Sequence, residues 1–267
     1  MKPLQWITVC LFAFGFAATV RADDEFDKLN ADFEAARKAY REKRMEEKLK
    51  DPEGLEATGG AVSGVPAFLL EFHPKFKVYA AKHADKPEAV SGLVWLVTHP
   101  ATQPSPDKPD PDAVEAIKML TEKHISDPSL VKDYKRIRGA EWFVGEKPVM
   151  DFFERVSQAN KDKEALASAS FCIGLIHYDS ASMPGMEGKK EEAESRRKLA
   201  LNMFRKVARD YPGTEAAQNA EPFFFELEKL QVGMTAPDIE GDGIDGKKIK
   251  LSQFRGKVVV VDFWGFW

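Results

Sequence analysis

The chain has 267 residues, 43% of them hydrophobic and 31% charged, and 39 Lys and Arg against 43 Asp and Glu give a net charge of −4. These values are those of a globular protein, and they exclude a disordered chain, a collagen and a protein with many membrane spans. Without a basic excess, nucleic acid is not an expected partner. The two cysteines, Cys10 and Cys172, are too few for a disulfide scaffold, a cysteine-rich zinc site or an internal Cys-x-x-Cys centre.

Residues 1–22 have the layout of a secretory signal peptide. Lys2 precedes the apolar run 6–20, and Val20-Arg-Ala22 resembles a cleavage site. The run is shorter than the roughly 20 residues of a spanning helix. We therefore expect an exported, periplasmic or otherwise extracytoplasmic protein that meets the membrane only through this peptide. The alternative is an uncleaved peptide that anchors the chain in the membrane.

A charged N-terminal segment covers 23–58, and most of it, 23–50, is predicted to be one helix. Apolar residues form a single stripe at helical spacing. These residues are Phe26, Leu29, Phe33, Ala36 and Tyr40. Asp51-Pro-Glu-Gly54 is expected to end the helix, and the glycines at 59–64 predict a flexible break.

Region 66–230 has a helical pattern throughout. Asp85 and Asp112 are each predicted to begin a capping box, and Asp127 to cap a helix that starts with Pro128. The proline-rich stretch 100–111 is expected to be extended and to separate two helical pairs. The predicted helices are 66–83, 87–99, 112–125, 128–138, 147–159, 162–179, 189–210 and 214–230. Their spacing predicts an array of helical hairpins.

The last hairpins carry the most specific packing pattern. Ala200, Phe204 and Val207 share one helix face that should pack on the preceding helix, where Gly174 and Tyr178 supply a small and an aromatic residue. This arrangement resembles a tetratricopeptide unit over 162–220, although the loop 180–190 is longer than that repeat allows. The array is therefore a candidate surface for a protein partner.

Beyond Gln231 the helical period ends. Asp245-Gly246 predicts a hairpin turn, followed by an alternating strand over 248–251. The β-branched run from Lys257 to Trp264 is apolar on both faces except at Asp262, which predicts a strand in the middle of a covered sheet. The expected fold class is mainly α: a tetratricopeptide-like helical hairpin array, followed by the first β-strands of an α/β domain.

Four short motifs in 231–267 carry a family resemblance. They are Val232-Gly-x-x-Ala-Pro-Asp238, Asp245-Gly-Lys247, Leu251-Ser-x-Phe-x-Gly-Lys257 and Val260-Val-Asp-Phe-Trp-x-x-Trp267. Together they are similar to the opening of exported thioredoxin-like thiol-disulfide oxidoreductases, the redoxin group related to the alkyl hydroperoxide reductase and thiol-specific antioxidant superfamily. The resemblance implies a thioredoxin-like fold, a Cys-x-x-Cys centre directly after the second tryptophan, and either a protein thiol or disulfide partner or a peroxide.

The sequence stops at Trp267, before the cysteines that the resemblance implies. Disulfide exchange needs an attacking thiolate and a second, resolving sulfur. We therefore expect the N-terminal portion of such an oxidoreductase, inactive as given, with no catalytic, cofactor-binding or metal-binding residue. Two alternatives stay open: a protein-binding helical module with a vestigial redoxin segment, and a helical spacer.

Other chemistry-bearing residues are expected to be structural. Cys172 lies in an apolar helical run and should be a buried, inert thiol. The five histidines do not have metal-ligand spacing; they are His73, His83, His99, His124 and His177. A hairpin turn explains Asp238, Asp242 and Asp245 better than a calcium loop does, and Phe223 to Phe225 are expected in the core. Asp262 is either a proton-transfer group or an exposed carboxylate.

Overall fold

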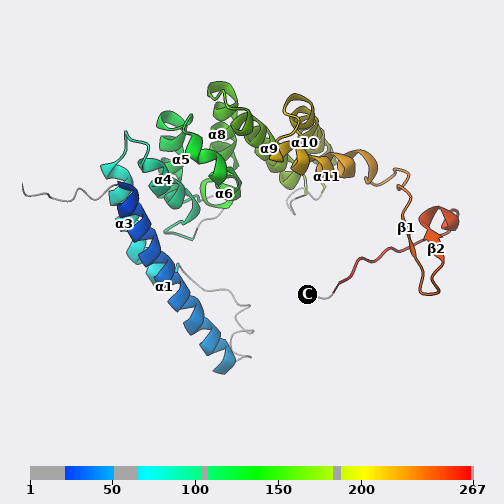
Figure 1. Cartoon of the computed structure of the whole chain (residues 1–267), viewed down its shortest axis with the longest axis horizontal. Coiled ribbons are helices and arrows are strands. Elements are labelled where there is room, and N and C mark those ends of the chain that lie inside the picture. Colours follow the sequence, from blue (N-terminus) through cyan, green and yellow to red (C-terminus); the bar gives the residue numbers. More distant parts are fainter. Residues whose placement is uncertain (1–21, 51–64, 104–107, 183–187, 266–267) are drawn as a thin grey trace, which may run out of the picture.

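The computed structural model describes residues 22–50, 65–103, 108–182 and 188–265, with the side chains of residues 22 and 23 left out (Figure 1). The predicted signal peptide and the glycine-rich break at 59–64 lie outside these ranges, apart from Ala22 at the peptide's end. The predicted helix over 23–50 is confirmed, because one helix runs from Ala22 to Lys50.

Within these ranges the chain forms ten α-helices and one small antiparallel sheet, which confirms the mainly α fold class. The α-helices are α1 (Ala22–Lys50), α3 (Ala67–Lys82), α4 (Ala89–Thr98), α5 (Pro111–Lys123), α6 (Tyr134–Gly139), α7 (Glu141–Val144), α8 (Glu146–Ala159), α9 (Lys163–Ser180), α10 (Lys190–Asp210) and α11 (Glu215–Lys229). The strands are β1 (Glu240–Asp242) and β2 (Lys248–Lys250), and the 3₁₀-helices are η1 (Pro128–Asp133) and η3 (Leu251–Phe254).

The helices follow one another along a row (Figure 1). Contacts run from α1 to α3, α4 and α5, then to α8, α9, α10 and α11, while the short helices α6 and α7 fill the space beside α4, α5, α8 and α9. The sheet lies past the α11 end of the row (Figure 1). Neighbouring hairpins therefore bury one another's apolar faces, as expected for an array.

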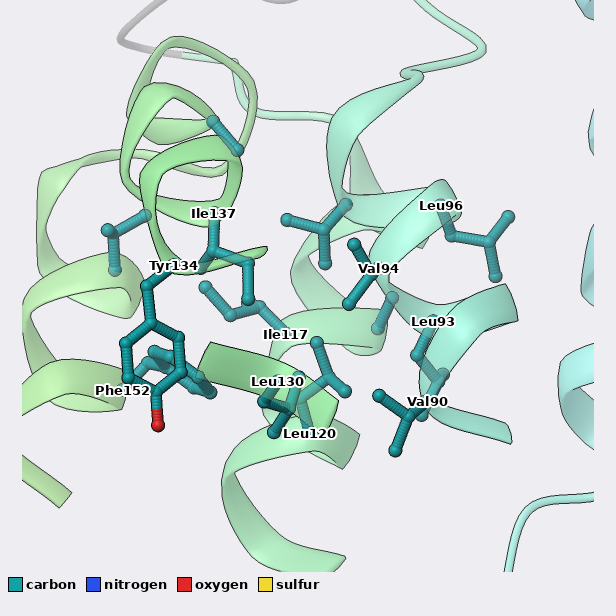
Figure 2. Packing of buried hydrophobic residues seen from close by; sticks show 14 of the residues in the cluster. Val90, Leu93, Val94, Leu96, Ile117, Leu120, Leu130, Tyr134, Ile137 and Phe152 are labelled. Carbon is teal, nitrogen blue, oxygen red and sulfur yellow. The ribbon is translucent and has the colours of Figure 1, made fainter. Parts of the chain in front are cut away.

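Two hydrophobic clusters form the core. The larger cluster extends from α1 to α9, and Figure 2 shows part of it, where Leu93 of α4, Leu120 of α5 and Tyr134 of α6 are buried. The smaller cluster joins α9, α10 and α11 around Phe171 and Phe204. Helix α9 contributes to both clusters, so it forms the wall between them.

Phe204 lies at the centre of the smaller cluster, in the position that the sequence predicts. Its side chain is fully buried, and a Cβ atom on Gly174 would lie 2.6 Å from its ring. Phe223 of α11 stacks on it with ring centroids 5.1 Å apart. The prediction that Phe223 to Phe225 all face the core is wrong for Phe225, which is 45% exposed.

Two of the three predicted caps are wrong. The Asp85 carboxylate forms an ion pair with Lys123 at 2.7 Å, and α4 begins without a side-chain cap. Helix α5 is capped by Asp110 rather than Asp112, because Pro111 occupies its first position and the Asp110 carboxylate accepts from the amides of residues 112 and 113. The Asp127 cap is confirmed, since its carboxylate accepts from the amide of residue 129.

The predicted helix over 128–138 is also divided. Its first part is η1, and the α-helical part begins only at Tyr134. The remaining predicted helices of the array match α3, α4, α5, α8, α9, α10 and α11 to within two residues at each end.

Replacing Phe204 by Ala should lower the free energy of unfolding by about 3–5 kcal/mol, because the substitution leaves a cavity between three helices. Urea denaturation followed by circular dichroism measures the loss. Leu199→Ala is the control, since Leu199 lies on the same helix and is 44% exposed. Equal, small losses for both variants would contradict the role of Phe204 in the core.

Candidate functional site

The segment that carries the four motifs begins with a hairpin. Strand β1 pairs antiparallel with β2, and Gly241 lies opposite Ile249. Gly246 adopts a left-handed conformation with φ of 75°, which favours glycine, and the Asp245 carboxylate accepts from the amide of Lys247 at 3.1 Å. The hairpin predicted from Asp245-Gly246 is therefore confirmed.

Asp238 ties two of the motifs together. Its carboxylate accepts from the amide of Ser252 at 2.8 Å and from the Ser252 hydroxyl at 2.7 Å. These hydrogen bonds hold the pKa of Asp238 below its usual range. Asp242 instead forms an ion pair with Lys248 across the hairpin, at 2.8 Å. The three aspartates thus form hydrogen bonds or ion pairs within the hairpin and its flanking residues. In the described part of the chain, no group of three or more metal-ligating side chains lies close enough together to hold a metal ion.

The run from Lys257 to Trp264 is not a strand in the structure, contrary to the prediction. Val258 and Val260 are 98% and 89% exposed. Val259 and Val261 point the other way and, with Phe254 and other apolar residues of the hairpin, line a hollow of about 250 Å³. The run alternates as a strand would, but the one sheet in the described chain consists of β1 and β2 and does not include it. Asp262 is exposed, which agrees with its interpretation as an exposed carboxylate.

Cys172 lies in the middle of α9 and is 1% exposed, so its predicted burial is confirmed. Burial among apolar side chains raises the pKa of its thiol to about 12. The thiol is therefore protonated at neutral pH, and a protonated thiol is a poor nucleophile. Cys172 is a core residue of α9 and does not lie in segment 231–267, which carries the four motifs.

A cavity of about 260 Å³ between η1, α6, α9 and α11 was not anticipated from the sequence. Tyr134, Phe171 and Cys172 line it, and an ion pair between Lys135 and Glu215, at 2.9 Å, lies at its rim. The buried Tyr134 hydroxyl has no hydrogen-bond partner among the described residues. The sequence carries no signal for this cavity, because its walls come from residues up to about 90 positions apart.

A polar network at the α8–α9–α10 junction was not predicted from the sequence either. The Glu146 carboxylate accepts from Arg196 at 2.7 Å and from the Ser180 hydroxyl at 2.8 Å, so it joins three helices. Arg196 lies 3.3 Å from the ring nitrogen of His177. These contacts fix how α10 lies against the rest of the array.

The histidines do not gather into a site. His99 stacks on Trp95 with ring centroids 4.5 Å apart, and burial lowers the pKa of His99 to about 4. His73 is buried in the same region, and burial lowers its pKa as well. His124 lies elsewhere and contacts the Ala84 carbonyl at 3.0 Å. The described histidines thus lie at separate places in the helical array, and His177 lies beside Arg196.

Comparison with known proteins shows similarity in one short segment. The proteins named thiol-disulfide oxidoreductase ResA from Bacillus thuringiensis (strain Al Hakam), Bacillus anthracis and Geobacillus kaustophilus (strain HTA426) are each 44% identical to this chain over 45 residues. That is 17% of this chain and 26% of each relative, so the chain spans about a quarter of the length of these curated relatives.

No family model and no solved structure matches the chain. The ResA matches nevertheless show that a short segment of this chain is similar to thiol-disulfide oxidoreductases, which is the class that the motifs predict. In the ranges that the structure describes, none of the helices has both the length and the apolar composition needed to cross a membrane.

The Cys172 thiol should not react with a thiol reagent such as dithionitrobenzoate at pH 8 in the folded chain, because its pKa is raised and its side chain is only 1% exposed. The measurement uses Cys10→Ser, so that one thiol remains, and compares native protein with protein in guanidinium. One equivalent should react only after unfolding. Rapid reaction of the native thiol would contradict its burial.

Residues 231–267 should be removed by a protease before the helical array is cut. Val232 is fully exposed and Met234 is 48% exposed, and among the described elements β1, β2 and η3 make no more than marginal contact with the helices. Thermolysin cleaves before such apolar residues, and mass spectrometry should find first cuts between Gln231 and Ala236. A chain that ends at Leu230 is the control. If residues 231–267 resisted the protease as well as the helices do, the prediction that this segment is only loosely attached to the array would be wrong.

Proposed function

We propose that residues 231–267 are the opening segment of an exported, thioredoxin-like thiol-disulfide oxidoreductase unit, and that the helical array positions its protein partner. The observation that carries this proposal is the 44% identity to ResA proteins over 45 residues. In such a unit the redox centre would follow the paired tryptophans, as the family resemblance implies. A protein thiol or disulfide would then be the substrate, with a peroxide as the other candidate.

The geometry of the segment supports this function. The bonds from Asp238 to Ser252 and the β1–β2 hairpin fold the first part of the segment without help from the helices. The run after Lys257 presents Val259 and Val261 to the hairpin and Val258 and Val260 to solvent. That alternation suits a strand that further elements would cover on both faces.

A second candidate function is a protein-binding helical module. Its support is the packing of α9, α10 and α11, where Gly174 admits the ring of Phe204 as in a tetratricopeptide unit. In this case the array alone would bind the partner, and the C-terminal segment would contribute nothing to activity. The two functions differ in whether residues 231–267 can become part of an active oxidoreductase.

A chimera tests the first function. The full chain, with Cys10→Ser, is continued after Trp267 by the part of the Bacillus anthracis ResA protein that follows its matching tryptophan and supplies two cysteines. The chimera should catalyse insulin reduction by dithiothreitol at least tenfold above background, because 231–267 would complete the sheet around the supplied redox centre.

Two matched controls define the result. One replaces both supplied cysteines by serine, and the other replaces residues 231–267 by a Gly/Ser linker of equal length. A chimera that keeps its helical content, yet is as inactive as the linker control while intact ResA is active, would reject the oxidoreductase proposal and favour the binding module.

A further inference from the structure

Helix α1 carries a row of polar and charged side chains beside the apolar stripe through which it packs in the array. From Asp27 the row continues at alternating spacings of three and four residues, which places its members on one face of a helix. In order, they are Asp27, Asn30, Glu34, Arg37, Arg41, Arg44 and Lys48. The first half of this row is acidic or neutral, and the second half is entirely basic.

The array uses a different face of α1. Phe26 lies against Phe76, and Tyr40 lies against Phe68, with ring centroids 5.9 and 5.2 Å apart. These contacts set α1 antiparallel to α3, and the last turns of α1 extend past α3 (Figure 1). The charged row lies about a quarter of a turn away from this apolar stripe.

Most of the charges in the row lack a partner outside α1. Asp27, Arg41 and Lys48 are exposed, and the described residues offer none of them an ion pair. Arg37 and Arg44 pair with Glu34 and Glu47 of the same helix. Asp27, Arg41 and Lys48 are therefore open to another surface, while Asn30, Glu34, Arg37 and Arg44 are half-buried.

The helix dipole does not account for this order of charges. Acidic side chains are favoured near the start of a helix and basic ones near its end, but the effect fades within the first and last turns. Glu34, Arg37 and Arg41 lie in the middle of the 29-residue helix, where the dipole has little influence. The change of sign between Glu34 and Arg37 needs another explanation.

We propose that this row binds the same row of a second copy of the chain, with the two α1 helices antiparallel. The register that sets Asp27 opposite Arg44 also sets Asn30 opposite Arg41 and Glu34 opposite Arg37. A twofold axis makes each of these contacts twice, as in any isologous dimer.

Only the antiparallel orientation matches the charges. Parallel helices in register would place Asp27 against Asp27 and Arg41 against Arg41, and like charges at such positions repel. Met45 and Leu49, 61% and 75% exposed, each follow a basic member of the row by one residue and add apolar surface beside it. Exposed ion pairs are individually weak, so the dimer depends on protein concentration and loosens in salt.

Sedimentation equilibrium of the full chain tests the dimer. In 20 mM salt the protein should dimerise, and in 500 mM salt the dissociation constant should rise at least tenfold. Two variants each give the row a single sign: Asp27→Lys with Glu34→Lys, and Arg37→Glu with Arg41→Glu, Arg44→Glu and Lys48→Glu. Each should be monomeric alone, and their equimolar mixture should dimerise again.

Recovery in the mixture separates loss of the dimer from loss of the fold, and circular dichroism checks that both variants keep their helices. A wild-type monomer at low salt and millimolar concentration would overturn the proposal. So would dimers that persist in either variant alone, or a mixture of folded variants that stays monomeric.

Cross-linking tests the orientation. With Cys10→Ser in the background, a mixture of Asp27→Cys and Arg44→Cys chains should form a mixed disulfide in preference to either homodimer. The buried Cys172 does not compete. Preferential linkage of Asp27→Cys to itself would indicate parallel helices and overturn the antiparallel arrangement.

Discussion

The structure depends on the burial of α9 on two faces. Phe171 and Cys172 are successive residues, so their side chains point about 100° apart around the helix, one into each hydrophobic cluster. A helix covered in this way must carry apolar side chains around most of its circumference, and small side chains where neighbouring helices approach closely. The small residues on the side that faces α10 are Ala167 and Gly174. Those on the side that faces α8 are Ala165 and Ala169.

The same burial keeps the Cys172 thiol in its protonated form. Cys172 lies in the wall between the two clusters and is only 1% exposed, so the charged form of its thiol is strongly disfavoured. In this state the Cys172 thiol is a poor nucleophile for disulfide exchange. The motifs that resemble thiol-disulfide oxidoreductases lie in a different kind of segment, which contains the β1–β2 hairpin and the hydrogen bonds from Ser252 to Asp238.

Much of the fold could be predicted from the sequence because its signals are local. The stripe from Phe26 to Tyr40 and the turn at Asp245-Gly246 depend on residues a few positions apart, and both are present in the structure. The predictions fail where a distant residue decides the outcome. Asp85 pairs with Lys123 instead of capping a helix, and the valine run after Lys257 has no neighbouring strand. For the same reason, the junction at Glu146 and the cavity beside Tyr134 could not be inferred, since their partners lie 34 to about 90 residues away.

The two ends of the helical row carry different features. The charged face of α1 lies at one end of the array, and segment 231–267 leaves from the other end, after α11 (Figure 1). A twofold contact through α1 would therefore leave α9, α10, α11 and the hairpin segment uncovered in both copies. The helices between these ends are joined by two hydrophobic clusters, so the packed array separates the two ends. A dimer of this kind would present two hairpin segments, one beyond each outer end, to partners that need not compete for space.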